Sequence, residues 1–224
     1  MSTQTLSFTL RTAVNHDDLR RACEVRSASY GHHLPDLTDA FAFPDATDLS
    51  PHTSVLLCED KATGEAIGTA RVQTTTRGNS TLPIESCVTL PEPLMRHGRA
   101  EITRMASVPG ADPLVRLALW KAGYLYCLAN QARWLLIGAR SPALARGYRR
   151  LGAVDLYDDQ RMVPLAYTGN MPHYVLRFDV IAAERKWFEC NHPLFGFMVD
   201  TVHADIQLFS PSFVQGAPAL RAVA

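Results

Sequence analysis

The chain has 224 residues, of which 47% are hydrophobic and 20% are charged, and its 22 basic residues balance 22 acidic ones. This length accommodates one large domain with a sizeable core, and the composition excludes a disordered chain, a collagen-like repeat and an integral membrane protein. Zero net charge argues against a dedicated nucleic-acid-binding protein, because neutralising phosphates needs a basic excess, and the longest apolar stretches are far shorter than the roughly 20 residues that span a bilayer.

The first elements along the chain are a helix and a hairpin. Apolar residues at helical spacing predict a helix over residues 17–30, with Asn15 or the first Asp of this stretch as its N-cap. Residues 54–59 and 65–75 are typical of strands, and Gly64 in the turn between them suits a left-handed backbone position. Together these strands predict a β-hairpin after the first helix.

Strands and helices alternate in the second half of the chain. The elements are a strand at 99–107, an apolar helix at 114–131, a strand at 133–139, a helix at 142–151 that begins after Ser141 and ends at Gly152, strands at 154–157 and 173–180, and a mostly helical segment at 181–208 that Pro193 interrupts. This order predicts an α/β protein whose sheet contains at least one parallel crossover.

Nothing in the sequence divides the chain, since it has no internal repeat and no linker-like segment. We expect a single domain over residues 6–216, with flexible ends at 1–5 and 217–224. The first residues lack the features of a secretory signal, and five scattered cysteines without a CxxC pair indicate neither a disulfide framework nor a zinc site. The missing signal and the unpaired cysteines predict a cytoplasmic protein. The histidines show no metal-ligand spacing, so we also predict that no metal is bound.

Basic residues are concentrated in one stretch. Residues 116–161 contain eight Lys or Arg and three Asp, so the rest of the chain carries an acidic excess of five. Such a basic face suits an anionic ligand or an acidic partner; the alternative is an ordinary solvated helix surface.

The strongest functional signal is a set of polar residues between positions 26 and 104. The set comprises Arg26 and Tyr30 on the first helix, Asp45 and Asp48 as a DxxD pair in the following loop, Arg71 in the strand GTARV, and Glu101, Thr103 and Arg104 in an ExTR strand. In order and spacing it resembles the signature of acyl-homoserine-lactone synthases and of the related long-chain N-acyl amino acid synthases. The resemblance implies the GNAT acyltransferase fold, with a central mixed sheet flanked by helices and here a C-terminal helical extension.

The sequence departs from the lactone-synthase signature in ways that bear on which of the two families it resembles more. The tryptophan that lactone synthases carry after the first helix is missing from GHHLPDL at 31–37, and Tyr30 stands where they have phenylalanine. The stretch GYRRLGA at 147–153 is similar to the FYxxxGF turn of ordinary GNAT enzymes and of the N-acyl amino acid synthases. Both departures favour the amino-acid branch.

The chemistry that the resemblance implies is attack of a primary amine on a thioester. A protonated amine is not a nucleophile, so a carboxylate must take its proton directly or through water; our candidate base is Glu101, and the alternative is a solvated strand carboxylate. Glu101 and Thr103 share one strand face while Arg104 points to the other, so we expect no Glu101–Arg104 ion pair. Tyr148 is our candidate acid for the departing thiolate, or else a core tyrosine. Hydrogen bonds to the oxyanion and to pantetheine would come from the backbone of Met105, Ala106 and Ser107.

Asp45 and Asp48 have two interpretations. They could bind the acceptor's ammonium group or pair with Arg26 and Arg71, and Asp is also common in ordinary loop turns. For the arginines, including Arg104, the alternative to acceptor binding is a buried ion-pair scaffold that holds the loop. We expect an architectural role for them.

The acyl donor would approach the loop at 108–113, which contains Gly110 and Ala111 and precedes the long helix. This loop lacks the glycine-rich sequence of coenzyme A-dependent GNAT enzymes, and Asp112 would repel a diphosphate. We therefore expect an acyl-phosphopantetheine thioester as co-substrate, on acyl carrier protein rather than on coenzyme A, and no tightly bound cofactor. The acidic carrier would meet a basic surface formed by Arg116, Arg146, Arg149 and Arg150.

Together these features predict an N-acyltransferase that moves a medium or long acyl chain to the amine of an amino acid or derivative. The alternatives are an acyl-homoserine-lactone synthase and a non-catalytic GNAT-like module that binds an acyl ligand or a protein. We expect the strand at 99–107 to separate from that at 133–139 near Ser107, where Pro109 and Gly110 interrupt pairing, and so to create the donor slot.

Overall fold

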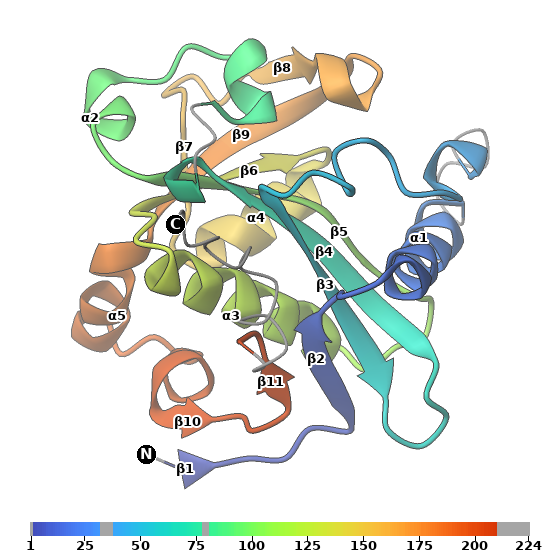
Figure 1. The fold of residues 1–224 in the computed structure, drawn as a ribbon. Helices are drawn as coiled ribbons and strands as arrows, with labels where there is room; N and C mark the ends of the chain where they lie inside the picture. The colour runs from blue at the N-terminus through green and yellow to red at the C-terminus, as the bar shows by residue number, and fades with distance from the viewer. Residues whose placement is uncertain (1, 32–37, 78–80, 210–224) are drawn as a thin grey trace, which may run out of the picture.

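A mixed β-sheet runs through the middle of the protein, and helices cover both of its faces (Figure 1). The computed structural model describes residues 2–31, 38–77 and 81–209. The strands are β1 (Ser2–Thr3), β2 (Phe8–Thr12), β3 (Thr53–Asp60), β4 (Ala66–Thr74), β5 (Arg99–Ser107), β6 (Trp134–Ala139), β7 (Val154–Asp155), β8 (Met162–Leu165), β9 (Met171–Asp179), β10 (Thr201–Val202) and β11 (Ile206–Gln207). The main sheet has the order β11-β2-β3-β4-β5-β6-β9-β7, with β8 also paired to β9.

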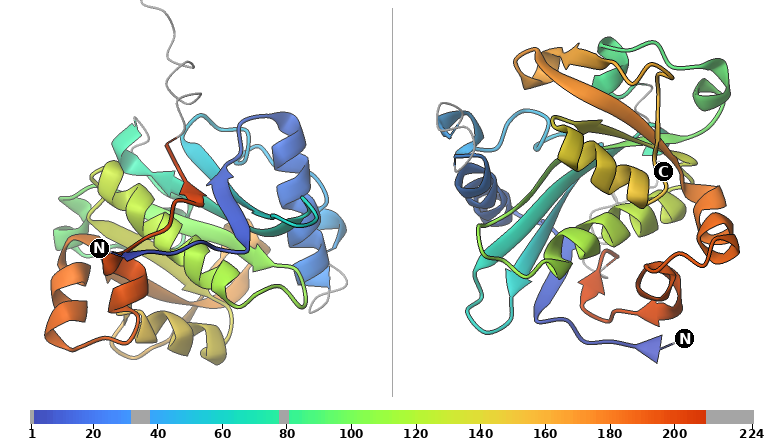
Figure 2. Two further views of the ribbon diagram at one scale, coloured as in Figure 1. Left: turned by 90° about the horizontal axis from the view of Figure 1, so that it is seen from below. Right: turned by 180° about the vertical axis from the view of Figure 1, so that it is seen from behind.

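The helices lie in two layers. In Figure 2, α1 lies on one side of the sheet and α3 on the other. The largest core cluster lies under α3, where Trp120 packs against Phe178 of β9. The helices are α1 (His16–Gly31), α2 (Glu92–Met95), α3 (Leu114–Ala129), α4 (Pro142–Arg150) and α5 (Val180–Glu189), joined by 3-10 turns that include η2 (Asp39–Phe41), η4 (Pro83–Ser86) and η5 (Ala166–Thr168). None of the helices within the described ranges is long and apolar enough to cross a membrane.

The predicted α/β class and most predicted elements are confirmed, and their ends follow local signals. The Asn15 side chain caps α1 by accepting the N–H of Asp18 at 2.8 Å, and Ser141 caps α4. Gly64 in the β3–β4 turn and Gly152 after α4 both have positive φ, as helix and hairpin ends often require. The strand expected at 154–157 is shorter, ending at Asp155.

The central strands separate as predicted, but earlier and for a different reason. Parallel pairing of β5 with β6 ends at the pair Ile102–Ile137, well before Ser107. Beyond that point β5 bulges, because Arg104 and Met105 together stand opposite one residue of β4, and Arg104 has a φ of 54°. The bulge redirects β5 away from β6, so Pro109 and Gly110 do not cause the separation.

The C-terminal extension contains the predicted helical segments, but it ends in two short strands that were not predicted. After α5 there is one π-helical turn (η6, Gly196–Asp200), and the chain then pairs as β10 with β1 and as β11 with β2. The buried Lys121 of α3 holds this segment, since its Nζ donates to the carbonyls of Phe197 at 2.7 Å and Thr201 at 2.6 Å. Burial lowers the pKa of Lys121 to about 8.

Two further strands were not predicted. β2 alternates buried and half-buried residues and fills the sheet between β3 and β11, while β8 contains Pro164 and pairs only with β9, as an edge strand allows. Ser2 and Thr3, in the end expected to be flexible, pair with β10. The other expected end, 217–224, and most of the GHHLPDL segment lie outside the described residues.

Candidate active site

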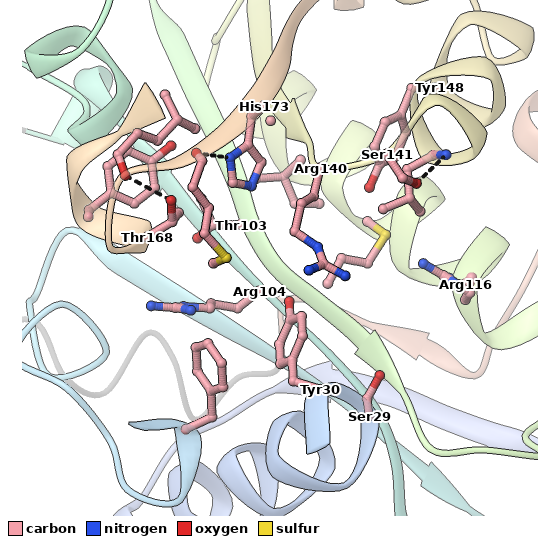
Figure 3. Close-up of a pocket in the computed structure, with 18 residues that line it drawn as sticks. Ser29, Tyr30, Thr103, Arg104, Arg116, Arg140, Ser141, Tyr148, Thr168 and His173 are labelled. Atoms are coloured by element: carbon pink, nitrogen blue, oxygen red, sulfur yellow. Dashed lines mark hydrogen bonds between the residues drawn. The ribbon is translucent and has the colours of Figure 1, made fainter. Parts of the chain in front are cut away.

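The main cavity, about 360 Å³ in volume, lies where β5 leaves β6. Figure 3 shows side chains from both sheet halves and from α1, α3 and α4 around this space, with the Tyr30 hydroxyl directed toward Arg140 and the Arg104 side chain extending away from it. Tyr30 of α1 packs on Phe41 at 4.6 Å between ring centres, and burial raises its pKa. The bulged segment of β5, residues 102–105, forms the floor, so the predicted Thr103, Arg104 and Met105 line the cavity.

Three arginines face this cavity, and none of the aspartates or glutamates in the described part of the chain lines it. They are Arg104 of β5, Arg116 of α3 and Arg140 after β6. None of the three has an ion-pair partner within residues 2–31, 38–77 and 81–209, and the Arg104 guanidinium lies 4.3 Å from the centre of the Phe41 ring. Burial and the charge of Arg71 lower the pKa of Arg104. The cavity therefore favours an anionic group.

Glu101 lies behind the cavity wall and is fully buried. Its Oε1 accepts the Tyr167 hydroxyl at 2.5 Å, and its Oε2 accepts the N–H of Ile84 at 3.0 Å. Burial raises the pKa of Glu101 to about 7, although these two donors and the charge of Arg71 act in the opposite direction. A carboxylate with this pKa can both take and release a proton at neutral pH.

The DxxD pair forms an ion-pair network instead of lining the cavity. Asp48 accepts from Arg26 at 2.7 Å, and both side chains are almost completely buried. Arg71 donates to both oxygens of Asp45 at 2.9 Å and, through Nε, to the Thr103 hydroxyl at 3.0 Å. Burial acts to raise the pKa of Asp45, but Arg71 outweighs it and leaves that pKa below its usual range. This geometry supports the architectural alternative, in which the network holds the loop and fixes Thr103 on the cavity floor.

Tyr148 separates the main cavity from an apolar groove between α3 and α4. The groove has a volume of about 340 Å³ and shares Met105, Arg116, Leu144 and Tyr148 with the cavity. The Tyr148 ring stacks on Trp120 at 5.4 Å, and burial raises its pKa to about 12. The phenol is therefore protonated at neutral pH and can donate to a group that arrives through the groove.

Other predicted donor residues lie away from both cavities. Asp112 lies just before α3, and its Oδ1 accepts the N–H of Leu114, the first residue of the helix, at 2.8 Å, so its carboxylate lies at the helix N-terminus. Arg149 is held by Asp155 at 2.7 Å, whereas Arg146 and Arg150 are exposed on α4. Neither cavity is lined by Ala106, Ser107, Gly110 or Ala111.

Sequence reasoning did not single out three residues that line the cavity: Arg140, Tyr167 and His173. The Nδ1 of His173 lies 2.8 Å from the Met171 carbonyl, so that nitrogen carries the proton and Nε2 is left as an acceptor. Burial lowers the pKa of His173, which keeps the ring neutral. Gly138 makes room for this ring, since a Cβ there would lie 3.4 Å from it. Only Arg140 had a sequence signal, as a charge directly after a buried strand.

Among the described residues, no group of three or more His, Cys, Asp or Glu side chains is arranged to hold a metal ion. The polar side chains at or beside the cavity that can exchange protons or bind an anion include Glu101, Tyr167, His173, Tyr148 and the three arginines.

Comparison with solved structures places the fold among acyltransferases. The chain is similar to FeeM, an N-acyl amino acid synthase from uncultured soil microbes, with a TM-score of 0.61 and 17% identity, over 85% of this chain and 98% of that one. It is also similar to BjaI, a CoA-dependent acyl-homoserine lactone synthase, with a TM-score of 0.55 and 18% identity over 91% and 94% of the two chains. An acyl-CoA N-acyltransferase from Pseudomonas aeruginosa matches with a TM-score of 0.52 and 15% identity, over 76% and 97%.

These similarities confirm the predicted GNAT acyltransferase fold. Neither a protein-family model nor a curated protein matches the sequence.

Proposed function

We propose that this protein is an N-acyltransferase that moves an acyl chain from a phosphopantetheine thioester to the amine of an amino acid. The observation that carries the proposal is the cavity at the β5–β6 separation, where a positively charged interior adjoins a buried carboxylate that titrates near neutral pH. An amino acid offers a carboxylate to the arginines and an amine to the base. The similarity of the fold to N-acyltransferases supports the same reaction.

The charge of the cavity favours an amino acid over the acceptor of the lactone synthases. The BjaI structure contains SAM, which carries a sulfonium in addition to its amine and carboxylate. In this chain Asp45 and Asp48 do not line the cavity and are already paired with Arg26 and Arg71. An additional positive charge beside Arg104 and Arg140 would therefore be repelled. Lactone synthesis remains the second candidate, because that fold similarity covers 91% of this chain.

The donor we propose is an acyl chain on acyl carrier protein. The Asp112 carboxylate accepts the first N–H of α3, at the helix end where coenzyme A would need room for its diphosphate, whereas a carrier protein presents a single phosphodiester. The pantetheine arm fits the α3–α4 groove, and Tyr148 at its inner end would donate to the departing thiolate. The exposed Arg146 and Arg150 would face the acidic carrier.

Measurement of thiol release tests this function. Purified protein is mixed with acyl carrier protein or coenzyme A esters of different chain length and with amino acids or SAM, and the products are identified by mass spectrometry. Amide formation with an amino acid supports the proposal. A lactone product would select the second candidate, and binding of the acyl donor without thiol release would indicate a non-catalytic module.

Charge reversal on α4 tests the donor. We expect Arg146→Glu with Arg150→Glu to lower kcat/KM with acyl carrier protein by about tenfold or more, with strong salt dependence, and to leave a small acyl thioester almost unaffected. Arg149→Glu is the contrasting variant, because it removes the ion pair with Asp155 and so acts on the fold. Equal losses with both donors after the double reversal would contradict the carrier-protein assignment.

A further inference from the structure

The candidate base cannot touch a substrate in the cavity. Glu101 has no exposed surface and does not line the cavity, and both of its oxygens already accept hydrogen bonds from Tyr167 and Ile84. Tyr167, in contrast, is one of the residues that line the cavity, and its hydroxyl contacts Glu101. The only polar side chain in contact with both the cavity and the carboxylate, among the residues described, is this tyrosine.

We infer that the Tyr167 hydroxyl is the group that takes the amine proton and relays it to Glu101. This inference rests on the proposed acyl transfer and adds a catalytic residue to it. The Tyr167 hydroxyl donates its hydrogen to Oε1 at 2.5 Å, and a phenol oxygen that donates can still accept, here from an amine that reaches it from the cavity. The short contact is typical of a charge-assisted hydrogen bond, along which a proton moves readily.

The relay balances in one step. The amine nitrogen forms a bond to the thioester carbonyl carbon, the carbonyl π electrons move to the oxygen, and the amine proton passes to the Tyr167 oxygen as the Tyr167 proton passes to Oε1 of Glu101. Tyr167 is neutral before and after the step, and Glu101 becomes a carboxylic acid. The carbonyl then re-forms as the C–S bond breaks, and the sulfur leaves with the electron pair and takes the Tyr148 proton. The proton held by Glu101 returns through Tyr167 and solvent to the Tyr148 phenolate.

The environment of Tyr167 suits a relay better than a direct base. Burial and the neighbouring Glu101 raise the pKa of Tyr167 far above neutrality, so the phenol stays protonated. A concerted relay needs no phenolate, because Tyr167 accepts one proton as it gives up another. Charged or titratable groups that act on this pair are Arg71, which favours both anions, and Glu85 and Cys87, which oppose them.

The position of Tyr167 is fixed by the turn that carries it. In η5, the Ala166 N–H donates to Sγ of Cys87 at 3.2 Å, and the Thr168 hydroxyl donates to the Leu165 carbonyl at 2.8 Å. The turn ends at Gly169, whose φ of 72° suits glycine. These contacts hold the hydroxyl over Glu101 without help from a ligand, as a preorganised proton path requires.

The test compares Tyr167→Phe with Tyr157→Phe, a tyrosine that lines neither cavity. We expect Tyr167→Phe to lower kcat by about 10²-fold or more and to move the acidic limb of the pH–rate profile to higher pH, because the lost hydrogen bond had favoured the Glu101 anion. Equal melting temperatures of the two variants would exclude misfolding. Retention of activity within threefold, or an unmoved acidic limb, would overturn the relay and indicate that Glu101 acts through water.

A second readout does not need turnover. In protein labelled with ¹³C at the Tyr Cζ position, the Tyr167 resonance, identified by its loss in Tyr167→Phe, should shift when alanine saturates the wild-type cavity. If no donor gives an amide but this shift occurs, the proposed function fails while the contact between amine and Tyr167 stands. An unchanged resonance at saturating alanine, in an enzyme that forms the amide, would overturn the inference.

Discussion

Two acidic centres lie on either side of Arg71, and they differ in what neutralises them. Asp45 and Asp48 are paired with two guanidinium groups, whereas the two oxygens of Glu101 accept only a phenol and a backbone N–H. The pKa of Asp45 is accordingly low and that of Glu101 is raised to about 7. A carboxylate paired with guanidinium groups thus has a lowered pKa, as at Asp45, whereas a buried carboxylate that accepts hydrogen bonds only from neutral donors, as at Glu101, becomes a usable base near neutral pH.

The largest expected effect is at Glu101. Glu101→Gln keeps the shape of the side chain but cannot accept the proton, so kcat should fall by about 10²- to 10⁴-fold while donor binding changes little. The exposed Glu65→Gln is the matched control and should have wild-type kinetics. If Glu101→Gln retains most activity in a folded protein, the base must be sought elsewhere, and His173, whose Nε2 is an unprotonated acceptor, would be examined first.

Substitutions at Asp45 and Asp48, the carboxylates paired with arginines, should lower the free energy of unfolding. Asp48→Asn leaves Arg26 buried without its counter-ion, so we expect the free energy of unfolding to fall by about 3 kcal/mol or more. Asp45 is 43% exposed in its side chain, and Asp45→Asn should cost at most about 1 kcal/mol. Urea denaturation measures both. A stable Asp48→Asn protein with a raised KM for the amino acid would instead mean that this carboxylate binds the acceptor's ammonium.

The same comparison predicts opposite pH dependences of stability. Because the pKa of Glu101 is about 7 when folded and about 4.5 when unfolded, the folded state retains a proton between these values. The stabilisation is complete below pH 4.5 and disappears as pH rises through 7, a loss of about 3 kcal/mol that Glu101→Gln should not show. Asp45, with its lowered pKa, acts in the other direction, since its contribution is lost only as the pH falls below 4. The urea midpoints of the wild type and of Glu101→Gln, measured from pH 4.5 to 8, give this difference in stability. Parallel midpoint–pH curves for the two proteins would contradict the raised pKa of Glu101.

Much of the fold was predictable because its signals are local. Helix and hairpin ends follow from single cap residues such as Asn15, Ser141 and Gly64. The bulge was not predictable, because Arg104 adopts a positive φ that its residue type does not favour and that packing against Phe41 supports from a distant turn. The C-terminal strands were missed because the segment that forms them is held by Lys121, a buried charge within a largely apolar helix.

The residues of the candidate site also divide into those that the sequence identified and those that only the structure reveals. The ExTR strand and the DxxD pair were identifiable as sets, and the structure joins them through Arg71 and Thr103. Tyr167 lies 66 positions from Glu101 in a turn without periodicity, so only the folded structure reveals their contact. Sequence spacing therefore located the charged groups. The contact of Tyr167 with Glu101, which distinguishes this carboxylate from the arginine-paired Asp45 and Asp48, depends on tertiary structure.

The central claim is that Glu101, the carboxylate without a cationic partner, is the base of the reaction. The pH dependence of kcat tests this claim most directly, because it shows whether the ionisation of Glu101 limits the rate. With saturating acyl donor and amino acid, kcat of the wild type should rise with pH and level off, with an apparent pKa near 7. In Glu101→Gln the residual rate should lose this limb. The same limb with the same pKa in Glu101→Gln would contradict the account, because another group would then be the titrating base.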